Sequence, residues 1–200
     1  MFPLVESIKV VDGKACNLKW HQLRYERSYR RFFNKEPKLR ISEIFSIPDR
    51  FCTGLVKARF CYDDANFNWE FHNYELKAHK TLKIINDNQI EYNLKYTDRS
   101  QLKKLYKKRD ECDDILIVKN SYITDTYSAN IVFYSGREWI TPSTPLLPGT
   151  CRARLLESGQ IYEDEIKISD LAKFKKFHLI NALLDFNKNG GEPISTIKVE

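Results

Sequence analysis

Four segments of the sequence carry groups that could act together on a small molecule. Lys95 lies where a strand is expected to end and a helix to begin, and side chains at strand ends can project into a cleft. Asp125 lies in the polar segment 124–130. The run Gly149-Thr150-Cys151-Arg152 opens an expected helix, whose first N–H groups and positive dipole end can hold an anion. Arg24, on an expected first helix, could add a guanidinium to the same anion.

An amine, a carboxylate and an anion cradle are the groups that a pyridoxal 5'-phosphate site requires. The lysine forms a Schiff base with the aldehyde, the acid pairs with the pyridinium nitrogen, and the cradle holds the phosphate. Each group also has an ordinary structural explanation. Lys95 would then be a solvated surface charge, Asp125 a turn former or helix cap, and the Gly149-Thr150 pair a simple helix start. Spacing alone leaves both explanations open.

Four segments of the chain resemble the signature blocks of the class IV aminotransferases, and they occur in that family's order. The family has the fold-type-IV pyridoxal-phosphate architecture, which is D-amino-acid aminotransferase-like. It includes branched-chain and D-amino-acid aminotransferases and aminodeoxychorismate lyase. Each block alone is too degenerate in sequence to identify the family, whereas four blocks in this order are specific for it. The blocks are His21-Gln22-Leu23-Arg24-Tyr25-Glu26-Arg27-Ser28, Leu94-Lys95-Tyr96-Thr97-Asp98-Arg99, Thr124-Asp125-Thr126-Tyr127-Ser128-Ala129-Asn130 and Leu147-Pro148-Gly149-Thr150-Cys151-Arg152.

The resemblance implies a role for each candidate residue. Lys95 would carry the cofactor as the internal aldimine, and Asp125 would take the place of the acid that pairs with the ring nitrogen. The phosphate would be held by a set drawn from three of the blocks, namely Arg24, Thr150, Cys151 and the turn amides of Ser128 and Ala129.

Two residues are candidates for contact with the substrate, and the sequence departs from the family pattern at three places. Arg59 falls where the family has an arginine near the substrate, although a surface ion pair is an equal alternative; Ser7 could line the pocket or be a structural hydroxyl. The family usually has Glu at the position of Asp125 and often Thr at that of Cys151, which is a poor hydrogen-bond donor. The family's customary segment before the first strand is also missing, so the N-terminus is expected to be shortened and the substrate stays open.

The resemblance favours a lyase of the aminodeoxychorismate type, which eliminates pyruvate to give 4-aminobenzoate. The block 94–99 is most like that branch, where an Asn-Arg or Asp-Arg pair closely follows the lysine. An aminotransferase of the branched-chain or D-amino-acid type, using the same lysine, is the alternative, and a non-catalytic cofactor-binding homologue is the second. The expected partners are a small-molecule substrate with amino and carboxylate groups and a second copy of the chain in a two-fold homodimer.

Charge, cysteine and hydropathy patterns exclude several other classes of protein. The 33 basic and 27 acidic residues give a net charge of +6, and the basic run 103–109 fits a helix with a solvated face better than a nucleic-acid groove. The five cysteines form no C-x-x-C pair and the four histidines have no ligand spacing, so neither a disulfide framework nor a metal site is expected. With no long apolar run and no secretory signal, a cytoplasmic protein that binds neither membrane nor nucleic acid is expected.

Hydropathy patterning predicts two α/β units of mixed, largely antiparallel sheet that join around residues 85–94, and the resemblance implies an α+β chain with two domains. A small α/β domain would span 1–87, and a larger cofactor-binding domain of mixed, largely antiparallel β-sheet with helices would span 88–200. The first domain would open with a hairpin turning at Asp12-Gly13 and continue into a helix over 20–33. In the second domain, the pattern predicts a helix that begins near Asp98 or Ser100 and a helix over 150–158. It predicts strands over 89–94, 114–118, 122–126, 130–134, 138–141 and 161–168.

Overall fold

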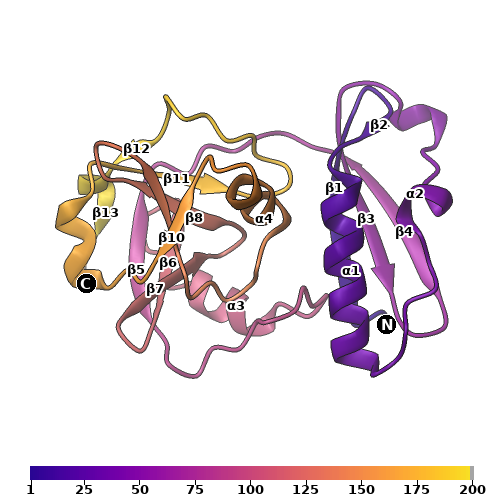
Figure 1. The fold of residues 1–200 in the computed structure, drawn as a ribbon, viewed down its shortest axis with the longest axis horizontal. Helices are drawn as coiled ribbons and strands as arrows, with labels where there is room; N and C mark the ends of the chain where they lie inside the picture. Colours follow the sequence, from indigo (N-terminus) through magenta and orange to yellow (C-terminus); the bar gives the residue numbers. More distant parts are fainter. Residues whose placement is uncertain (199–200) are drawn as a thin grey trace. The chain divides into compact units, whose positions relative to one another are not determined.

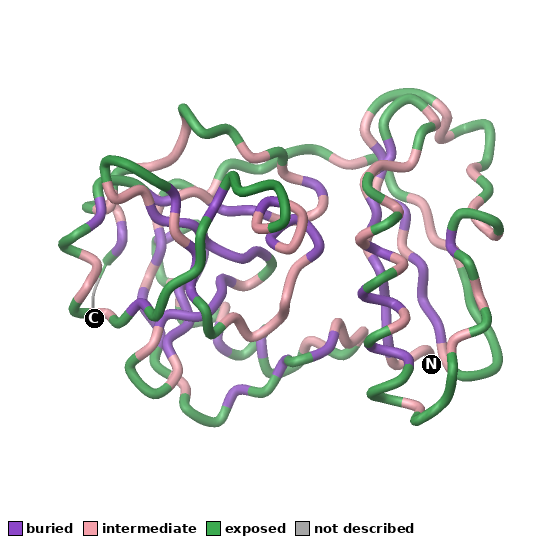
Figure 2. Tube along the Cα trace, in the orientation of Figure 1, coloured by how far each residue is buried: buried purple, intermediate pink, exposed green. Residues whose placement is uncertain are grey.

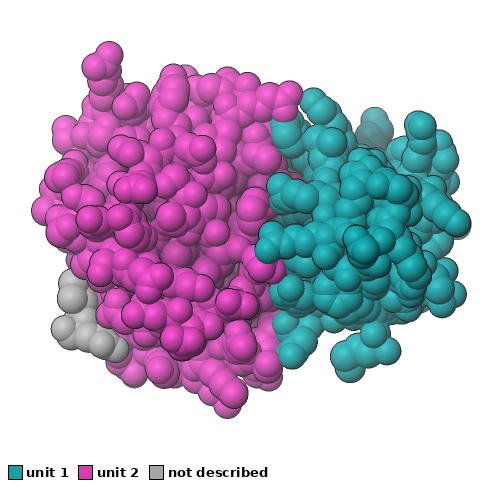
Figure 3. Space-filling model, turned by 60° about the horizontal axis from the view of Figure 1, so that its bottom comes forward, with its two compact units in different colours: residues 1–76, 94–98 teal, residues 77–93, 99–200 magenta. Residues whose placement is uncertain are grey.

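The computed structural model describes residues 1–198, which form two compact units (Figure 3). Unit 1 comprises residues 1–76 together with 94–98, and unit 2 comprises residues 77–93 together with the described residues from Arg99 onward. The chain therefore crosses from one unit to the other three times. Within residues 1–198, no helix combines the length and the apolar character that crossing a lipid bilayer requires.

Unit 1 is an antiparallel sheet packed on one long helix (Figure 1). The sheet has the order β2-β1-β3-β4, and alternate residues of β1 and β3 are buried, as expected for a sheet with one face covered. Buried positions on α1 recur every three or four residues, which places them on one face of the helix (Figure 2). The elements are β1 Leu4–Val11, β2 Lys14–Ala15, α1 Leu18–Phe33, α2 Ile41–Ile44, a 3-10 turn Asp49–Phe51, β3 Leu55–Tyr62 and β4 Phe67–Asn73.

Unit 2 is built on a nine-stranded mixed sheet with the path β10-β9-β8-β7-β6-β5-β13, and β11 joins it by pairing with β8 and β12. The pairs β5–β6, β5–β13 and β9–β10 are parallel and the others are antiparallel. The strands are β5 Leu82–Asn86, β6 Asp114–Lys119, β7 Tyr122–Thr126, β8 Asn130–Tyr134, β9 Trp139–Pro142, β10 Tyr162–Asp164, β11 Lys176–Ile180, β12 Glu192–Pro193 and β13 Ile197–Lys198. The helices are α3 Ser100–Tyr106 and α4 Thr150–Glu157, with 3-10 turns at Ile168–Lys173 and Ile194–Thr196.

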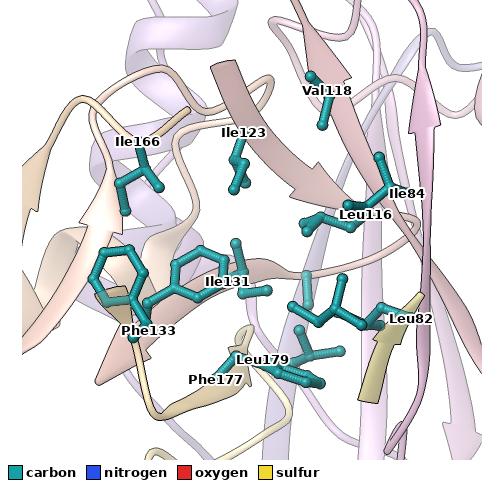
Figure 4. Packing of buried hydrophobic residues seen from close by; sticks show 13 residues of the cluster. Leu82, Ile84, Leu116, Val118, Ile123, Ile131, Phe133, Ile166, Phe177 and Leu179 are labelled. Carbon is teal, nitrogen blue, oxygen red and sulfur yellow. The ribbon is translucent and has the colours of Figure 1, made fainter. Parts of the chain in front are cut away.

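The main core of unit 2 lies where the strands β5 to β8 and β11 bring apolar side chains together (Figure 4). Phe133 and Phe177 are fully buried within it and come from paired positions of β8 and β11. A second cluster lies around α4 and includes Trp139, Cys151 and Leu155. This packing fixes β7, the β7–β8 turn and the start of α4 relative to one another.

Most predicted elements of the sequence are confirmed, with small shifts at their ends. The predicted helix 20–33 begins at Leu18, and the helix expected near Asp98 or Ser100 begins at Ser100. The strand predicted over 89–94 is wrong, because that stretch has no regular secondary structure. The strand predicted over 161–168 shortens to Tyr162–Asp164.

The bounds of the two units differ from the predicted domains 1–87 and 88–200. Residues 82–86 form β5, which pairs with β6 and β13 and so belongs to unit 2. Residues 94–98 return to unit 1, where the Val5 N–H donates a hydrogen bond of 3.0 Å to the Lys95 carbonyl. Strand pairing, rather than position along the chain, therefore decides which unit a segment joins.

Candidate functional site

Unit 1 contains a buried network of three charged or polar side chains between β1 and α1. Glu6 faces the helix in line with the apolar Leu4 and Ile8, and it is fully buried. Arg24 donates to it from two nitrogens: Nε to Glu6 Oε1 at 2.8 Å and Nη2 to Glu6 Oε2 at 2.5 Å. His21, one helical turn before Arg24, contacts Glu6 Oε2 through Nδ1 at 2.6 Å. Arg24 and His21 therefore hold the same carboxylate.

The charges in this network follow from its burial and its contacts. Burial alone would raise the pKa of Glu6, but the Arg24 charge and the hydrogen bonds from His21 and Arg24 outweigh it and lower this pKa to about 2. Burial lowers the pKa of His21, and the positive charges of Arg24 and Lys95 add to that effect against the contact with Glu6. His21 is therefore neutral at pH 7. Since Glu6 is an acceptor only, His21 Nδ1 carries the proton and donates it.

Lys95 lies beside the first residues of β1. Its carbonyl accepts the hydrogen bond from Val5, and its neighbour Tyr96 forms a β-bridge with Leu4. The side chain is half-buried, and its charge is close enough to His21 to lower the pKa of that residue. Unit 1 thus brings two of the predicted cofactor residues, Lys95 and Arg24, to the β1 side of α1.

The two substrate candidates, Ser7 and Arg59, are directly opposite each other on β1 and β3. Arg59 is in turn paired across to Glu70 on β4 and forms an ion pair with it. Because side chains alternate along a strand, Ser7 and Glu6 point to opposite faces of the sheet. Ser7 and Arg59 therefore lie on the polar face and Glu6 on the face that α1 covers.

In unit 2, Asp125 lies buried at the base of the β7–β8 turn. Its Oδ1 accepts a hydrogen bond from Asn130 Nδ2 at 2.7 Å, and its Oδ2 accepts one from the Leu147 N–H at 2.8 Å. Asn130 also donates to the Leu147 carbonyl at 2.8 Å. Asp125 and Asn130 are the paired residues that close the hairpin, so the turn and the segment before α4 are tied together through one carboxylate.

Asp125 combines a buried carboxylate with donors to both of its oxygens. Burial raises its pKa to about 6, although the hydrogen bonds from the Leu147 N–H and Asn130 and the charge of Arg152 act in the opposite direction. A carboxylate with this pKa changes charge just below neutral pH. It still has lone pairs available, since an ionised carboxylate offers about four acceptor positions.

The start of α4 approaches Asn130 so closely that only glycine fits at position 149. A Cβ at Gly149 would lie 2.0 Å from Asn130 Oδ1, while its φ of −71° is open to any residue. The requirement is therefore one of space rather than of backbone conformation. No side chain caps the first turn of α4, and Thr150 is buried at its first position. A helix start of this kind is suited to an anion.

Cys151 and the residues of the β7–β8 turn would contact a phosphate in different ways. The Cys151 side chain packs in the apolar cluster around α4, so its backbone N–H is the group that a phosphate could use. Ser128 and Ala129 lie in the turn itself, where Ala129 O accepts from the Thr126 N–H at 2.9 Å. Unit 2 thus brings Asp125, the turn and the start of α4 together around Asn130.

Three residues of these sites were given no role from the sequence, namely Glu6, His21 and Asn130. Glu6 had a visible signal: an acid stands at an inward position of a strand that is otherwise apolar there, and a buried carboxylate needs partners. Its partners are polar residues on the buried face of α1. Asn130 was the last residue of a signature block and had no assigned role.

Comparison with known proteins identifies the family. The family described as Amino-transferase class IV matches residues 66–186. An uncharacterized protein of Haemophilus influenzae is 37% identical over 186 residues, which cover 92% of this chain and 98% of that protein. The chain therefore belongs to the class IV aminotransferase family.

Solved structures agree on the fold. One crystal structure is that of a Haemophilus somnus 129PT protein provisionally named a 4-amino-4-deoxychorismate lyase. Its sequence is 35% identical and its TM-score is 0.84. The match covers 92% of this chain and 97% of that chain. A hypothetical aminotransferase from Mycobacterium tuberculosis in its pyridoxal-phosphate-bound form has a TM-score of 0.78 at 16% identity, covering 91% and 77% of the two chains. These neighbours confirm the predicted α+β fold of the fold-type-IV pyridoxal-phosphate enzymes.

Proposed function

We propose that this chain binds pyridoxal 5'-phosphate through Lys95 and catalyses a lyase reaction of the aminodeoxychorismate type. The observation that carries the cofactor proposal is the chemistry of the donor set. It includes a half-buried lysine, a buried carboxylate with a pKa of about 6, and an uncapped helix start with a buried threonine. An aldehyde, a pyridine nitrogen and a phosphate are the three groups that such donors suit.

Each residue has a defined role in this proposal. The Lys95 amine holds the cofactor covalently and moves a proton at the amino-bearing carbon of the substrate. Asp125, in its anionic form, pairs with the protonated ring nitrogen. The phosphate is held by Thr150, the backbone N–H of Cys151, the turn amides of Ser128 and Ala129, and Arg24. The bound cofactor supplies the electron sink that makes the substrate proton acidic.

The lyase reaction is favoured by the names of two relatives. The Haemophilus somnus structure, which is 35% identical, carries the lyase name. A protein of Schizosaccharomyces pombe that is provisionally named an aminodeoxychorismate lyase is 38% identical over 58 residues. These residues are 28% of this chain and 25% of that protein. In this reaction Lys95 removes the proton from the amino-bearing carbon, and the enolpyruvyl group leaves as the ring becomes aromatic. The departing group takes up a proton to give pyruvate, and 4-aminobenzoate remains. An aminotransferase with the same lysine is the second candidate, supported by the family to which the chain belongs.

A single-turnover experiment separates the two reactions. Holoprotein mixed with aminodeoxychorismate and no keto acid should release 4-aminobenzoate and pyruvate in equal amounts and regain its starting absorbance band. A lyase needs no second substrate, whereas a transaminase ends its first half-reaction in the pyridoxamine form. Disappearance of the band with an ordinary amino acid and its return with 2-oxoglutarate would assign the chain to the aminotransferases. A coloured protein inert in both assays would contradict both and favour a cofactor-binding homologue.

The pKa of Asp125 predicts how cofactor affinity depends on pH. A carboxyl with a pKa of about 6 is anionic above that pH and protonated below it, so the pairing with the ring nitrogen weakens on acidification. At pH 5 about one molecule in ten keeps the anion, and we expect about tenfold weaker binding than at pH 7 from this cause.

The cofactor phosphate itself titrates near pH 6, so the measurement needs a matched variant. Asp125→Asn keeps the phosphate titration and removes that of the carboxyl. Dissociation constants measured by absorbance from pH 5 to 8 should show the additional tenfold change in the wild type alone. Parallel pH profiles in the two proteins would exclude Asp125 as the partner of the ring nitrogen.

A further inference from the structure

The guanidinium of Arg24 is held in one orientation by a single carboxylate. Nε and Nη2 donate to the two oxygens of Glu6 at 2.8 and 2.5 Å, a bidentate arrangement in which the two planar groups fix each other. Arg24 has a third nitrogen, Nη1, which takes no part in the Glu6 contact. The remaining N–H donors, two on Nη1 and one on Nη2, therefore point in directions that the Glu6 contact fixes.

The carboxylate that holds Arg24 also accepts a hydrogen bond from His21. His21 donates from Nδ1 to Glu6 Oε2 at 2.6 Å, and His21 and Arg24 are both nearly inaccessible, at 1% and 6% exposure. Glu6 lies on β1, whose ladder with β3 extends over all eight of its residues. The carboxylate is thus anchored by the sheet, and the guanidinium by the carboxylate.

The charges of this network also sum to zero. Glu6 is anionic, Arg24 cationic and His21 neutral, so the network is not a free positive charge that attracts any anion. Such a pair has a smaller desolvation cost than an isolated buried cation, because each charge compensates the other. What it offers an anion is a preorganised donor rather than net charge.

We propose that Glu6 is a positioning residue for the cofactor phosphate: it holds Nε and Nη2 of Arg24 so that Nη1 is the donor that meets the phosphate. This inference rests on the proposed function, in which Arg24 is a phosphate ligand. Glu6 touches neither the cofactor nor the substrate and acts only through Arg24. Loss of its charge therefore weakens the recognition of the phosphate and of no other part of the cofactor.

The test compares pyridoxal 5'-phosphate with pyridoxal, which lacks the phosphate. The ratio of their dissociation constants measures what the phosphate contributes, and a general loss of stability affects both ligands alike. In Glu6→Gln the amide cannot accept from both nitrogens of Arg24, so we expect the preference for the phosphorylated form to fall about tenfold or more. The affinity for pyridoxal itself should stay within about twofold of the wild type.

The control is Ser28→Ala. Ser28 is buried on the same face of α1 and its side chain bonds to Tyr62, so its loss perturbs the same core while both partners of the Glu6–Arg24 contact are kept. The ratio should be unchanged in this variant. If Glu6→Gln does not fold, Glu6→Asp keeps the charge but is too short to span both nitrogens, and the same fall in the ratio is expected. An unchanged ratio in the folded variant would overturn the inference.

Arg24→Met separates this inference from the proposed function. If Arg24→Met lowers the ratio and the Glu6 variant does not, Arg24 binds the phosphate without Glu6 and the inference is wrong while the function stands. If both lower it, adding Glu6→Gln to Arg24→Met should cause no further fall, because Glu6 acts through Arg24. Wild-type protein that binds neither pyridoxal nor its phosphate would instead refute the proposed function itself.

Discussion

Lys95→Ala should abolish the covalent attachment of the cofactor and lower turnover by about 10²–10⁴-fold, the usual contribution of a positioned acid–base group. The fold should survive, because the structural contact of Lys95 in β1 pairing is made by its backbone carbonyl, which alanine keeps. Borohydride reduction followed by peptide mapping checks this result. The wild type should carry the reduced pyridoxyl group on the Lys95 peptide, and the variant should carry none.

Lys119→Ala is the matched control for this experiment. Lys119 is also a half-buried lysine, and its Nζ donates to the Ile90 carbonyl at 2.8 Å. Its replacement should leave both the labelling and the turnover unchanged. A pyridoxyl group recovered from Lys119 or any other lysine would refute the assignment of Lys95.

Arg24→Ala should lower the free energy of unfolding of the cofactor-free protein by about 3–5 kcal/mol at pH 7, since it leaves the Glu6 carboxylate buried without its cation. The Arg24 contact lowers the pKa of Glu6, so this stabilisation is present above the ordinary pKa of a glutamate and is lost as the pH falls towards 2. The difference between variant and wild type should therefore shrink on acidification. Chemical denaturation at pH 7 and pH 3 measures both values.

Arg30→Ala provides the comparison on the same helix. Arg30 is half exposed and bonds to Glu36 at 2.9 Å, and an exposed pair of this kind contributes less than about 1 kcal/mol. The double variant Glu6→Leu with Arg24→Met should regain most of the stability, because no charge is then left buried. If Arg24→Ala and Arg30→Ala have the same free energy of unfolding, the buried pair does not stabilise unit 1.

Arg24 therefore has two separable effects, on folding and on the phosphate. A loss of cofactor binding in Arg24→Ala alone could come from either one. The ratio of pyridoxal phosphate to pyridoxal affinity isolates the second effect, and denaturation without cofactor isolates the first. Measuring both on one set of variants distinguishes a structural ion pair from a preorganised phosphate donor.

The sequence by itself determined the elements whose signals are local. The period-2 pattern of β1, the helical spacing of buried positions in α1 and the Ser100 helix start each depend on neighbouring residues only, and all three were confirmed. Motif order along the chain was likewise enough to identify the family. It also selected Lys95, Asp125 and the start of α4 as candidates, whose roles stay predictions.

The strand predicted over 89–94 shows why local signals fail for sheets. A strand exists only where another strand offers an unpaired edge, and β5, just before this stretch, is paired on both sides by β6 and β13. Residues 89–94 have the composition of a strand, but they have no regular secondary structure. The alternation of residue types could not reveal this, because β13 lies at the far end of the described chain.

Tertiary structure alone decided the contacts that shape the candidate site. Glu6 meets Arg24 because β1 packs under α1 with one particular register, and no spacing rule joins a strand residue to a helix residue across a turn. Asn130 meets Gly149 because the β7–β8 hairpin and the start of α4 converge in space. Buried polar groups must find partners, but which partners they find depends on how the elements pack. The sequence thus determined the residue types, and packing decided which of them act together.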